Sequence, residues 1–270
     1  MGTAAAMYLF FTDETNVDPH QGKFFIYGGL ILTPEQLGQA HGAVEEVRRR
    51  YGYLDTDSFK FQTASRPKQL TVEEFTAAKA EVVAAANRLD IRMIIYVVLH
   101  DIAKNQPTET NIEWALNSVL ADFDMRFLSD HNSYGTVCID RLPEKFSYDY
   151  LKSKFQGGVT LPDGRNPRLS RIVHYSVSSD GASHVSSLVD IALGGVRYCV
   201  NAAGGIGKEP IAKAMFPNLA QMLWHKTTAE GTRQVGGYGF IQYPKNIKVP
   251  QYATMYQELA TTLGEWGSTP

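Results

Sequence analysis

The hydrophobic and polar positions along the chain predict strands that alternate with helices. Short apolar runs predict strands over residues 8–11, 24–32, 91–99, 136–139 and 171–175. Apolar residues at helical spacing predict helices over residues 34–50, 71–89, 109–128, 184–200, 209–224 and 252–266. A further helix is expected after Pro143, and a short edge strand is expected over residues 59–61.

Local signals fix several of these elements. Thr33 and Gln36 form one capping box, and Thr71 and Glu74 form another, so a helix should begin directly after each threonine. The segment 91–99 is apolar nearly throughout, which is typical of a central strand covered on both faces. The first two strands are joined by a short polar turn, which predicts an antiparallel pair.

Two early strands followed by alternating helices and strands predict an α/β fold with a mixed central sheet flanked by helices. We expect one domain over residues 7–270, with a core over about 7–200 and a C-terminal helical extension over about 201–270. Residues 1–6 are small and uncharged, and we expect them to be disordered or to derive from a tag.

The composition restricts the class of partner. Lys and Arg total 26 and Asp and Glu total 28, so the net charge is -2 and a nucleic-acid partner would need a local basic patch or bound metal ions. Two cysteines, Cys138 and Cys199, cannot build a disulfide framework, which favours a reducing, cytoplasmic location. The longest apolar run, 93–99, is too short to span a membrane, so no membrane partner is expected.

Three aspartates have related placements. Asp13 follows the first strand with Glu14 beside it, and Asp140 ends the fourth strand. Asp190 lies in the helix after the last strand, on a stripe of small residues where Gly194 permits close approach of another segment. Carboxylates that meet in this way form an oxygen-rich cluster suited to Mg²⁺ or Mn²⁺. The alternative is that each aspartate is a turn or capping residue.

Four short motifs occur in a recognisable order. They are Phe-Thr-Asp-Glu-Thr at 11–15, Tyr-Gly-Gly-Leu-Ile at 27–31, Val-Cys-Ile-Asp-Arg at 137–141 and Ser-Ser-Leu-Val-Asp-Ile-Ala-Leu-Gly at 186–194. Together they resemble the family called domain of unknown function 3800, a bacterial and phage group with an RNase H-like fold. The resemblance covers about residues 7–200.

This resemblance implies a metal-dependent phosphodiesterase that acts on RNA or DNA. In such an enzyme Asp13, Asp140 and Asp190 would bind one or two Mg²⁺ or Mn²⁺ ions. Glu14 would be a further ligand or an outer group, and Lys60 would lie near the phosphate.

The chain also departs from the family pattern. Ser58 stands where the family has the glutamate of a Glu-x-Lys-aromatic motif, and Ser187 stands where it has a helical glutamine. The alternative function is therefore a catalytically degenerate RNase H-like module. Such a module would bind nucleic acid or a protein partner, for example in phage defence or in mobile elements.

A local basic cluster offers a second contact with nucleic acid. Arg165, Arg168 and Arg171 surround a loop rich in glycine and proline, and together with Lys60 they are our candidate phosphate-binding residues. The alternative is that this loop is simply solvated.

Overall fold

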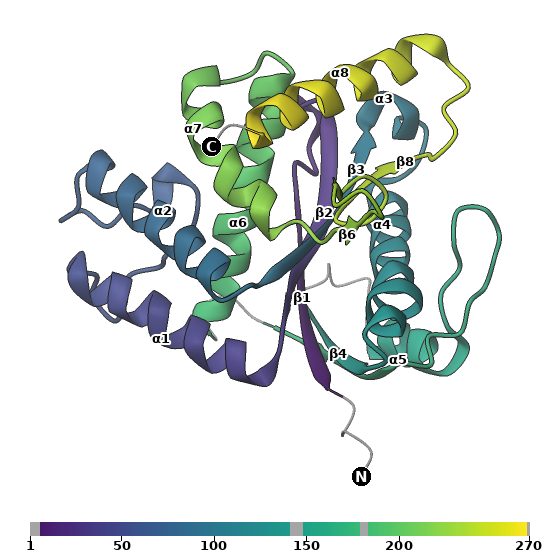
Figure 1. Ribbon diagram of the computed structural model, residues 1–270, viewed down its shortest axis with the longest axis horizontal. Helices are drawn as coiled ribbons and strands as arrows, with labels where there is room; N and C mark the ends of the chain where they lie inside the picture. Colours follow the sequence, from purple (N-terminus) through teal and green to yellow (C-terminus); the bar gives the residue numbers. More distant parts are fainter. Residues whose placement is uncertain (1–5, 141–147, 179–182, 269–270) are drawn as a thin grey trace.

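The computed structural model describes residues 6–140, 148–178 and 183–268 (Figure 1). Nearly all of the segment 1–6 therefore lies outside the described residues, as do Arg141 and Pro143. A six-stranded sheet occupies the centre, with the order β5-β4-β1-β2-β3-β8. The predicted α/β class, with a mixed central sheet flanked by helices, is confirmed.

The strands of this sheet run in both directions. Their bounds are β1 Met7–Thr15, β2 Phe24–Leu32, β3 Arg92–Leu99, β4 Tyr134–Ile139, β5 Ile172–Val177 and β8 Phe240–Tyr243. The pairs β1–β2 and β2–β3 are antiparallel, which confirms the predicted hairpin, whereas β1–β4, β4–β5 and β3–β8 are parallel. Because β1 and β4 are parallel neighbours, the residues that follow them emerge at the same end of the sheet.

One face of the sheet carries most of the helices, on the left and across the top of Figure 1. They are α1 Pro34–Arg50, α2 Val72–Arg88, α6 His184–Ala203, α7 Glu209–Met222 and α8 Pro250–Gly267. Both predicted capping boxes are formed, at Thr33 and at Thr71. Phe24, Ile26 and Leu30 of β2 pack against this layer.

The other face is covered mainly by α4, Thr108–Asp122, which continues as a π-helix over Phe123–Leu128. The smaller helices α3 His100–Ala103 and α5 Tyr148–Gly157 lie on the same side in Figure 1. Phe25 and Tyr27 pack here with Phe123, since successive residues of a strand point to opposite faces. All nine residues of β2 are buried, so this strand lies between two hydrophobic layers.

The predicted edge strand over residues 59–61 is wrong, because this segment forms no strand. Its backbone forms hydrogen bonds with side chains of two helices instead. The Phe61 N–H donates to Asp190 Oδ2 at 2.6 Å, and Lys79 Nζ donates to the Phe61 carbonyl at 2.9 Å. Phe59 is buried, with 1% exposure, in the hydrophobic core that also contains residues of α1, α2 and α6. The apolar pattern of the segment therefore reflects packing under a loop rather than pairing in the sheet.

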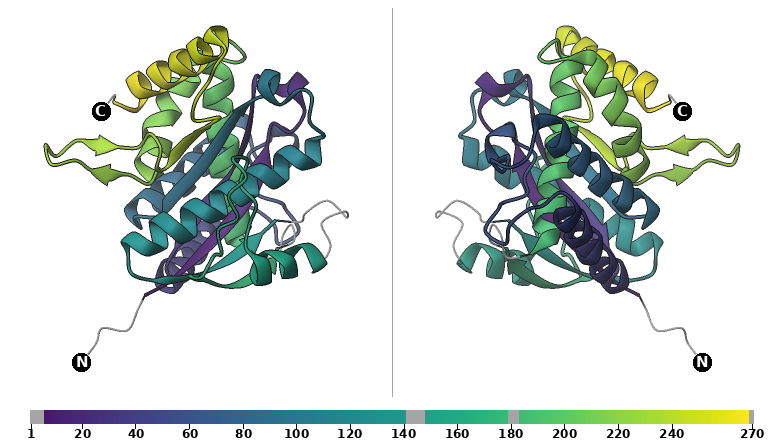
Figure 2. Two further views of the ribbon diagram at one scale, coloured as in Figure 1. Left: turned by 90° about the vertical axis from the view of Figure 1, so that its right-hand side faces the viewer. Right: turned by 90° about the vertical axis from the view of Figure 1, so that its left-hand side faces the viewer.

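The sequence predicts a helical C-terminal extension, but the structure also contains strands there. The extension contributes β8 to the sheet edge and a separate hairpin, β6 Lys226–Thr227 with β7 Arg233–Gln234, which projects from the body in Figure 2. These strands of two to four residues are too short for a periodic pattern to reveal. Short 3₁₀ turns occur at Pro19–Gln21 and Thr63–Ser65. Among the described residues, no helix has the combined length and apolarity that crossing a bilayer requires.

One buried carboxylate ties the π-helix to the start of β5. Asp124 is 3% exposed, and its Oδ2 accepts the N–H groups of Arg171 and Ile172 at 2.6 and 3.0 Å. Burial raises the pKa of Asp124, and the two N–H donors oppose that rise. The irregular helical turn therefore orients a side chain that fixes the edge of the sheet.

We expect Asp124→Ala to lower the free energy of unfolding by about 2–4 kcal/mol, because it leaves two backbone N–H groups without an acceptor. Asp124→Asn retains an acceptor oxygen and should lose clearly less. Urea denaturation of the two variants and the wild type measures both values. Equal losses would show that the hydrogen bonds to Arg171 and Ile172 do not stabilise the fold.

Candidate functional site

A cavity of about 240 Å³ lies where β1 and β4 end, and we call it the acidic cavity. It is lined by all four acidic residues predicted from the sequence and by one of the predicted basic residues. Its polar lining residues are Thr12, Asp13, Glu14, Asp140, Asp190, Lys60, Ser178, Ser186 and Cys138. The structure thus brings together four carboxylates from three separate segments of the chain.

Sheet pairing places two of these acids side by side. Thr12 of β1 pairs with Ile139 of β4, so Asp13 and Asp140 are the next residues on two adjacent parallel strands. The Asp140 N–H donates to the Thr12 carbonyl at 2.9 Å and extends the ladder by one bond. The prediction that the strands bearing Asp13 and Asp140 are neighbours is therefore confirmed.

The third acid is positioned by a close packing contact. Asp190 lies on α6, and a Cβ atom added to Gly194, one turn further along, would come within 2.4 Å of the Phe61 side chain. Only glycine leaves room for the 58–61 segment at this distance, as the small-residue stripe predicted. The same segment carries Lys60 to the rim of the acidic cavity.

The surroundings of Asp13 and Glu14 raise the pKa of both carboxyl groups. Burial, followed by the charges of Glu14, Asp140 and Asp190, raises the pKa of Asp13 to about 8. Burial and the charge of Asp140 raise the pKa of Glu14 to about 7. Like charges in a poorly solvated place disfavour ionisation, so the cluster takes up protons unless a cation compensates it.

Asp190 has a second role outside the cavity. Its Oδ2 accepts the Phe61 N–H, and Lys79 holds the carbonyl of the same residue. Burial between the rings of Phe61 and Phe75 lowers the pKa of Lys79 to about 8, and Asp190 acts in the opposite direction. The 58–61 segment is therefore held at both backbone polar groups of Phe61.

Hydroxyl groups complete the wall of the acidic cavity. Ser183 caps α6 by accepting the Ser186 N–H at 3.2 Å, and the Ser178 and Ser186 hydroxyls lie 3.1 Å apart. Ser178 and Ser186 were not among the site residues predicted from the sequence. The serine-rich stretch before the helix was the available signal, but only the fold shows which of its hydroxyls reach the cavity.

The carboxylate oxygens of the acidic cavity are the kind of ligand that a hard cation prefers. Every carboxylate in the acidic cavity supplies oxygen, and a bound cation would offset the burial and like-charge repulsion that raise the pKa values of Asp13 and Glu14. In the described ranges, however, no three His, Cys, Asp or Glu side chains are already arranged as a metal site. A cation would therefore have to draw the carboxylates into position.

The predicted arginine cluster lies away from the acidic cavity. Arg165 forms an ion pair with Asp163 at 2.8 Å, and Arg168 is exposed on the same loop. The Arg171 guanidinium donates to the Ser133 carbonyl at 3.3 Å, beside the start of β5. Of the four basic residues predicted to bind phosphate, only Lys60 lines the cavity.

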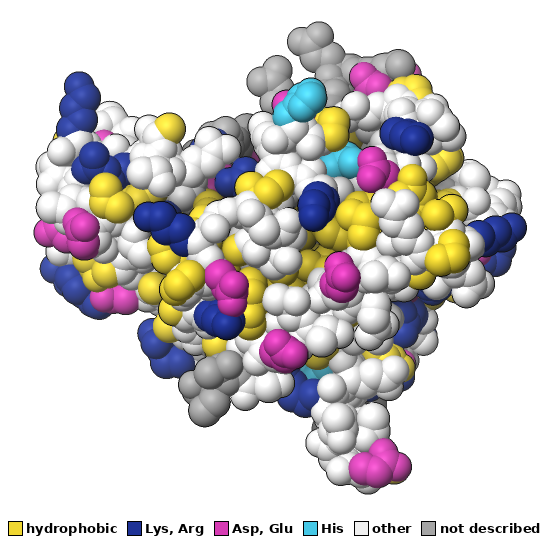
Figure 3. All heavy atoms as spheres, turned by 90° about the horizontal axis from the view of Figure 1, so that it is seen from above, with side chains coloured by type: hydrophobic (Ala, Val, Ile, Leu, Met, Phe, Trp, Pro, Cys, Tyr) yellow, Lys and Arg dark blue, Asp and Glu magenta, His cyan; other side chains and the backbone are white. Residues whose placement is uncertain are grey.

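Two further hollows lie near the acidic cavity. Glu14 also lines a shallow hollow of about 560 Å³, together with Gln62 and Arg197. That hollow shares Val17, Pro19 and Thr108 with a smaller pocket, so the three spaces are neighbours. Figure 3 views this end of the molecule from above and shows acidic and basic side chains interspersed rather than a field of one sign.

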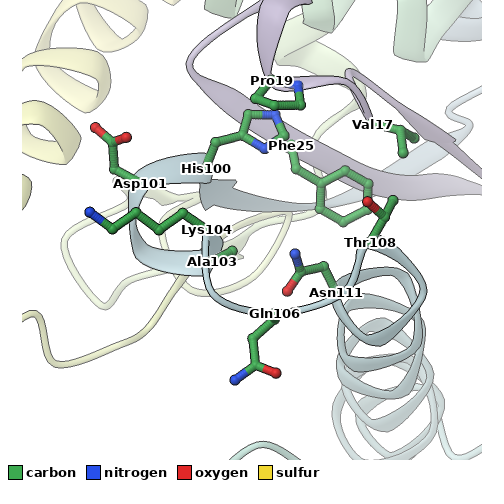
Figure 4. A pocket seen from close by; sticks show the side chains of 10 residues that line it. All are labelled: Val17, Pro19, Phe25, His100, Asp101, Ala103, Lys104, Gln106, Thr108 and Asn111. Carbon is green, nitrogen blue, oxygen red and sulfur yellow. The ribbon is translucent and has the colours of Figure 1, made fainter.

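The smaller pocket, of about 230 Å³, surrounds His100 (Figure 4). His100 Nε2 lies 2.9 Å from the Asn16 carbonyl oxygen, and burial lowers the pKa of the imidazole. Asn16 has a positive φ of 59°, which turns the chain sharply after Glu14. The turn therefore links the acidic cavity to the end of β3, where Lys104 also lines the pocket.

No family model matches this sequence, and comparisons with curated proteins and with solved structures found no match. The resemblance to domain of unknown function 3800 therefore stays a prediction. What the chain does must be argued from the geometry of the acidic cavity.

The raised pKa of Asp13 makes stability depend on pH in metal-free solution. Between its ordinary value near 3.8 and its folded value of about 8, the folded state holds a proton that the unfolded state has lost. The contribution of Asp13 to the free energy of unfolding therefore falls as pH rises from about 4 to about 8. Asp13→Asn removes this effect.

We expect Asp13→Asn to be more stable than the wild type at pH 8 in EDTA, by at least about 1 kcal/mol, because one pKa unit corresponds to about 1.4 kcal/mol. The difference should shrink at pH 5. Chemical denaturation at both pH values measures it. A variant that is less stable than the wild type at pH 8 would indicate a capping role for Asp13 instead.

We expect Gly194→Ala to displace the 58–61 segment and to lower the free energy of unfolding by about 1–3 kcal/mol, because the added methyl group overlaps Phe61. Gly42→Ala is the matched control, since a Cβ atom at this helical position meets nothing within 4 Å. Thermal unfolding compares them. Equal behaviour of the two variants would refute the close approach of Phe61 to α6.

Proposed function

We propose that this protein is a metal-dependent phosphodiesterase that cleaves nucleic acid. The observation that carries the proposal is the convergence of Asp13, Glu14, Asp140 and Asp190 on one cavity. The mixed sheet, with acids at the ends of adjacent parallel strands and a third acid from a helix, also supports the RNase H-like fold that the resemblance implies.

Asp13, Asp140 and Asp190 are the residues that would hold one or two Mg²⁺ or Mn²⁺ ions, with Glu14 as a further ligand or an outer group. When bound, such ions activate water and stabilise a leaving oxygen in phosphodiester hydrolysis. The chain itself contributes Lys60, whose ammonium group at the rim would attract a phosphate oxygen. Ser178 and Ser186 add hydroxyl groups that can donate to the same phosphate.

The substrate class follows from the shape of the site and the charge near it. Two hollows lie in succession beside the acidic cavity, the first sharing Glu14 with it and the second surrounding His100, and this arrangement suits an extended substrate rather than a small compact one. Arg197 and Lys104 line these hollows and can contact successive phosphates. Neither RNA nor DNA is favoured by these contacts.

A second function, binding without cleavage, is favoured by two observations. Ser58 stands where the resembling family has a glutamate, so one carboxylate of the family pattern is missing. Asp190 already accepts the Phe61 N–H, which occupies one of its oxygens. A degenerate module would keep the hollows and the basic contacts but would lack a metal-binding set able to promote hydrolysis.

The decisive experiment uses labelled RNA and DNA, in single- and double-stranded forms, with Mn²⁺. We expect the wild type to cleave at least one substrate. Asp13→Asn should reduce the rate by about 100-fold or more, because a positioned group that stabilises developing charge is lost. Asp149→Asn, an exposed acid on α5, is the control and should retain activity.

Folding is monitored in parallel by thermal unfolding. An Asp13→Asn variant that is destabilised but still active would refute the metal-ligand role. A wild type that binds these substrates but cleaves none of them would support the non-catalytic module instead.

A further inference from the structure

An apolar pocket lies between α7, α8 and the segment that leads from the β6–β7 hairpin into β8. Its volume is about 460 Å³, and none of its lining residues lines the acidic cavity. The hairpin projects below α8 in both views of Figure 2. We call this space the α7–α8 pocket, and its apolar lining residues include Phe216, Leu223, Val235, Phe240 and Leu263.

The floor of the α7–α8 pocket belongs to the hydrophobic core. Phe216, Leu223 and Leu263 are only 3–4% exposed and are members of the core on the α6 side of the sheet. Val235 and Phe240 are partly buried and pack against the same core. Water gains little from contact with such a lining, so an alkyl group is favoured there.

Small residues on α8 keep the pocket open. Ala260, Gly264 and Gly267 line it, and a Cβ atom added to Gly264 would meet nothing within 4 Å. The α8 lining residues run from Ala260 to Ser268, which corresponds to about 12 Å along the helix axis. The pocket therefore follows α8 over a length that an extended alkyl chain can occupy.

Arg233 of β7 is the one charged side chain among the described lining residues of the α7–α8 pocket. Its Nη2 donates to the Gln221 carbonyl at 3.2 Å and lies 3.2 Å from His225 Nδ1, which orients the guanidinium. Within the described part of the chain Arg233 forms no ion pair, because the nearby Asp90 pairs with Arg92 at 2.6 Å instead. An otherwise uncharged lining thus receives a positive charge that no carboxylate of the protein pairs with.

A second arginine strengthens the positive potential beside the pocket. Burial and the charge of Arg92 lower the pKa of Arg233, and Asp90 acts in the opposite direction. Like charges near each other are unfavourable, and an anion next to Arg233 offsets that repulsion. The charge and the apolar lining therefore favour a ligand that has both an alkyl part and an anionic part.

We propose that the α7–α8 pocket binds a carboxylate with an unbranched alkyl chain, that is, a medium-chain fatty acid. The chain would lie along α8 on Phe216, Leu223 and Leu263, and the carboxylate would pair with the Arg233 guanidinium. An uncharged apolar ligand would leave Arg233 unpaired, and a small anion would leave the apolar lining in water. The volume lies in the range of small-ligand sites.

The test is calorimetric titration of the full chain in EDTA, where no divalent ion can hold a carboxylate in the acidic cavity. The ligands are octanoate, decanoate, 1-decanol and acetate, each below the concentration at which it forms micelles. We expect decanoate to bind about 10-fold more tightly than octanoate, because each buried methylene group strengthens binding several-fold. It should also bind at least 5-fold more tightly than 1-decanol, and acetate should show no binding.

A first pair of variants tests the charge. Arg233→Gln should weaken decanoate binding at least 5-fold, to about the affinity of 1-decanol, while the affinity for 1-decanol itself stays the same. Lys226→Gln is the matched control, since Lys226 is a cation of the same hairpin that does not line the pocket. It should leave the affinity for decanoate unchanged.

A second pair of variants tests the place of the alkyl chain. Gly264→Leu should fill the pocket and weaken decanoate binding at least 10-fold. The thermal midpoint should not fall, because the new side chain enters open space and leucine favours a helix more than glycine does. Gly42→Leu on α1 makes the same change at another open helical position outside the pocket and should leave binding unchanged.

Four results would overturn the proposal. The first is no decanoate binding at millimolar concentration, and the second is equal affinity of the wild type for decanoate and 1-decanol. The third is decanoate binding that Gly264→Leu leaves unchanged, which would place the ligand elsewhere. The fourth is sedimentation that shows a dimer for the wild type and a monomer for Gly264→Leu, which would assign the pocket to a second copy of the chain.

Discussion

The parallel pairing of β1 with β4 is the constraint on which the site depends. It places Asp13 beside Asp140 at the end of the sheet, in a cavity that also receives Glu14 and Asp190. Burial and mutual repulsion oppose this arrangement, as the raised pKa values of Asp13 and Glu14 show. The hydrophobic layers on both sides of β2 supply the stability that keeps the carboxylates together.

The acidic cavity and the hollow lined by Tyr96 and Tyr243 use different properties of the same sheet. The acidic cavity lies where strands end, so backbone register places Asp13 beside Asp140, and the packing of α6 adds Asp190. The hollow lined by Tyr96 and Tyr243 lies beside the edge strand β8, whose four residues leave part of the wall to the loop around Arg165 and to α4. A short edge strand thus leaves space that a longer strand would fill with its own side chains.

Much of the fold was predictable because its signals are local. Capping boxes at Thr33 and Thr71 mark the helix starts, and the apolar run before Leu99 marks the central strand. The positions of Asp13 and Asp140 at the ends of two apolar runs likewise predicted that the two residues would be neighbours. By contrast, the path of the 58–61 segment depends on Asp190, Gly194 and Lys79, which are distant in sequence. The hollow lined by Tyr96 and Tyr243 likewise depends on the pairing of β8 with β3, which no local pattern reveals.

The two backbone hydrogen bonds of Phe61 have a consequence for communication between the acidic cavity and the surface beside it. The Phe61 N–H is held by Asp190 and the Phe61 carbonyl by Lys79, so the position of the segment depends on two ionisable groups at once. A ligand that draws the Asp190 carboxylate into the cavity competes with the Phe61 N–H for that oxygen. Occupancy of the cavity is therefore linked thermodynamically to the conformation of the loop that carries Lys60, and each favours or disfavours the other by the same free energy.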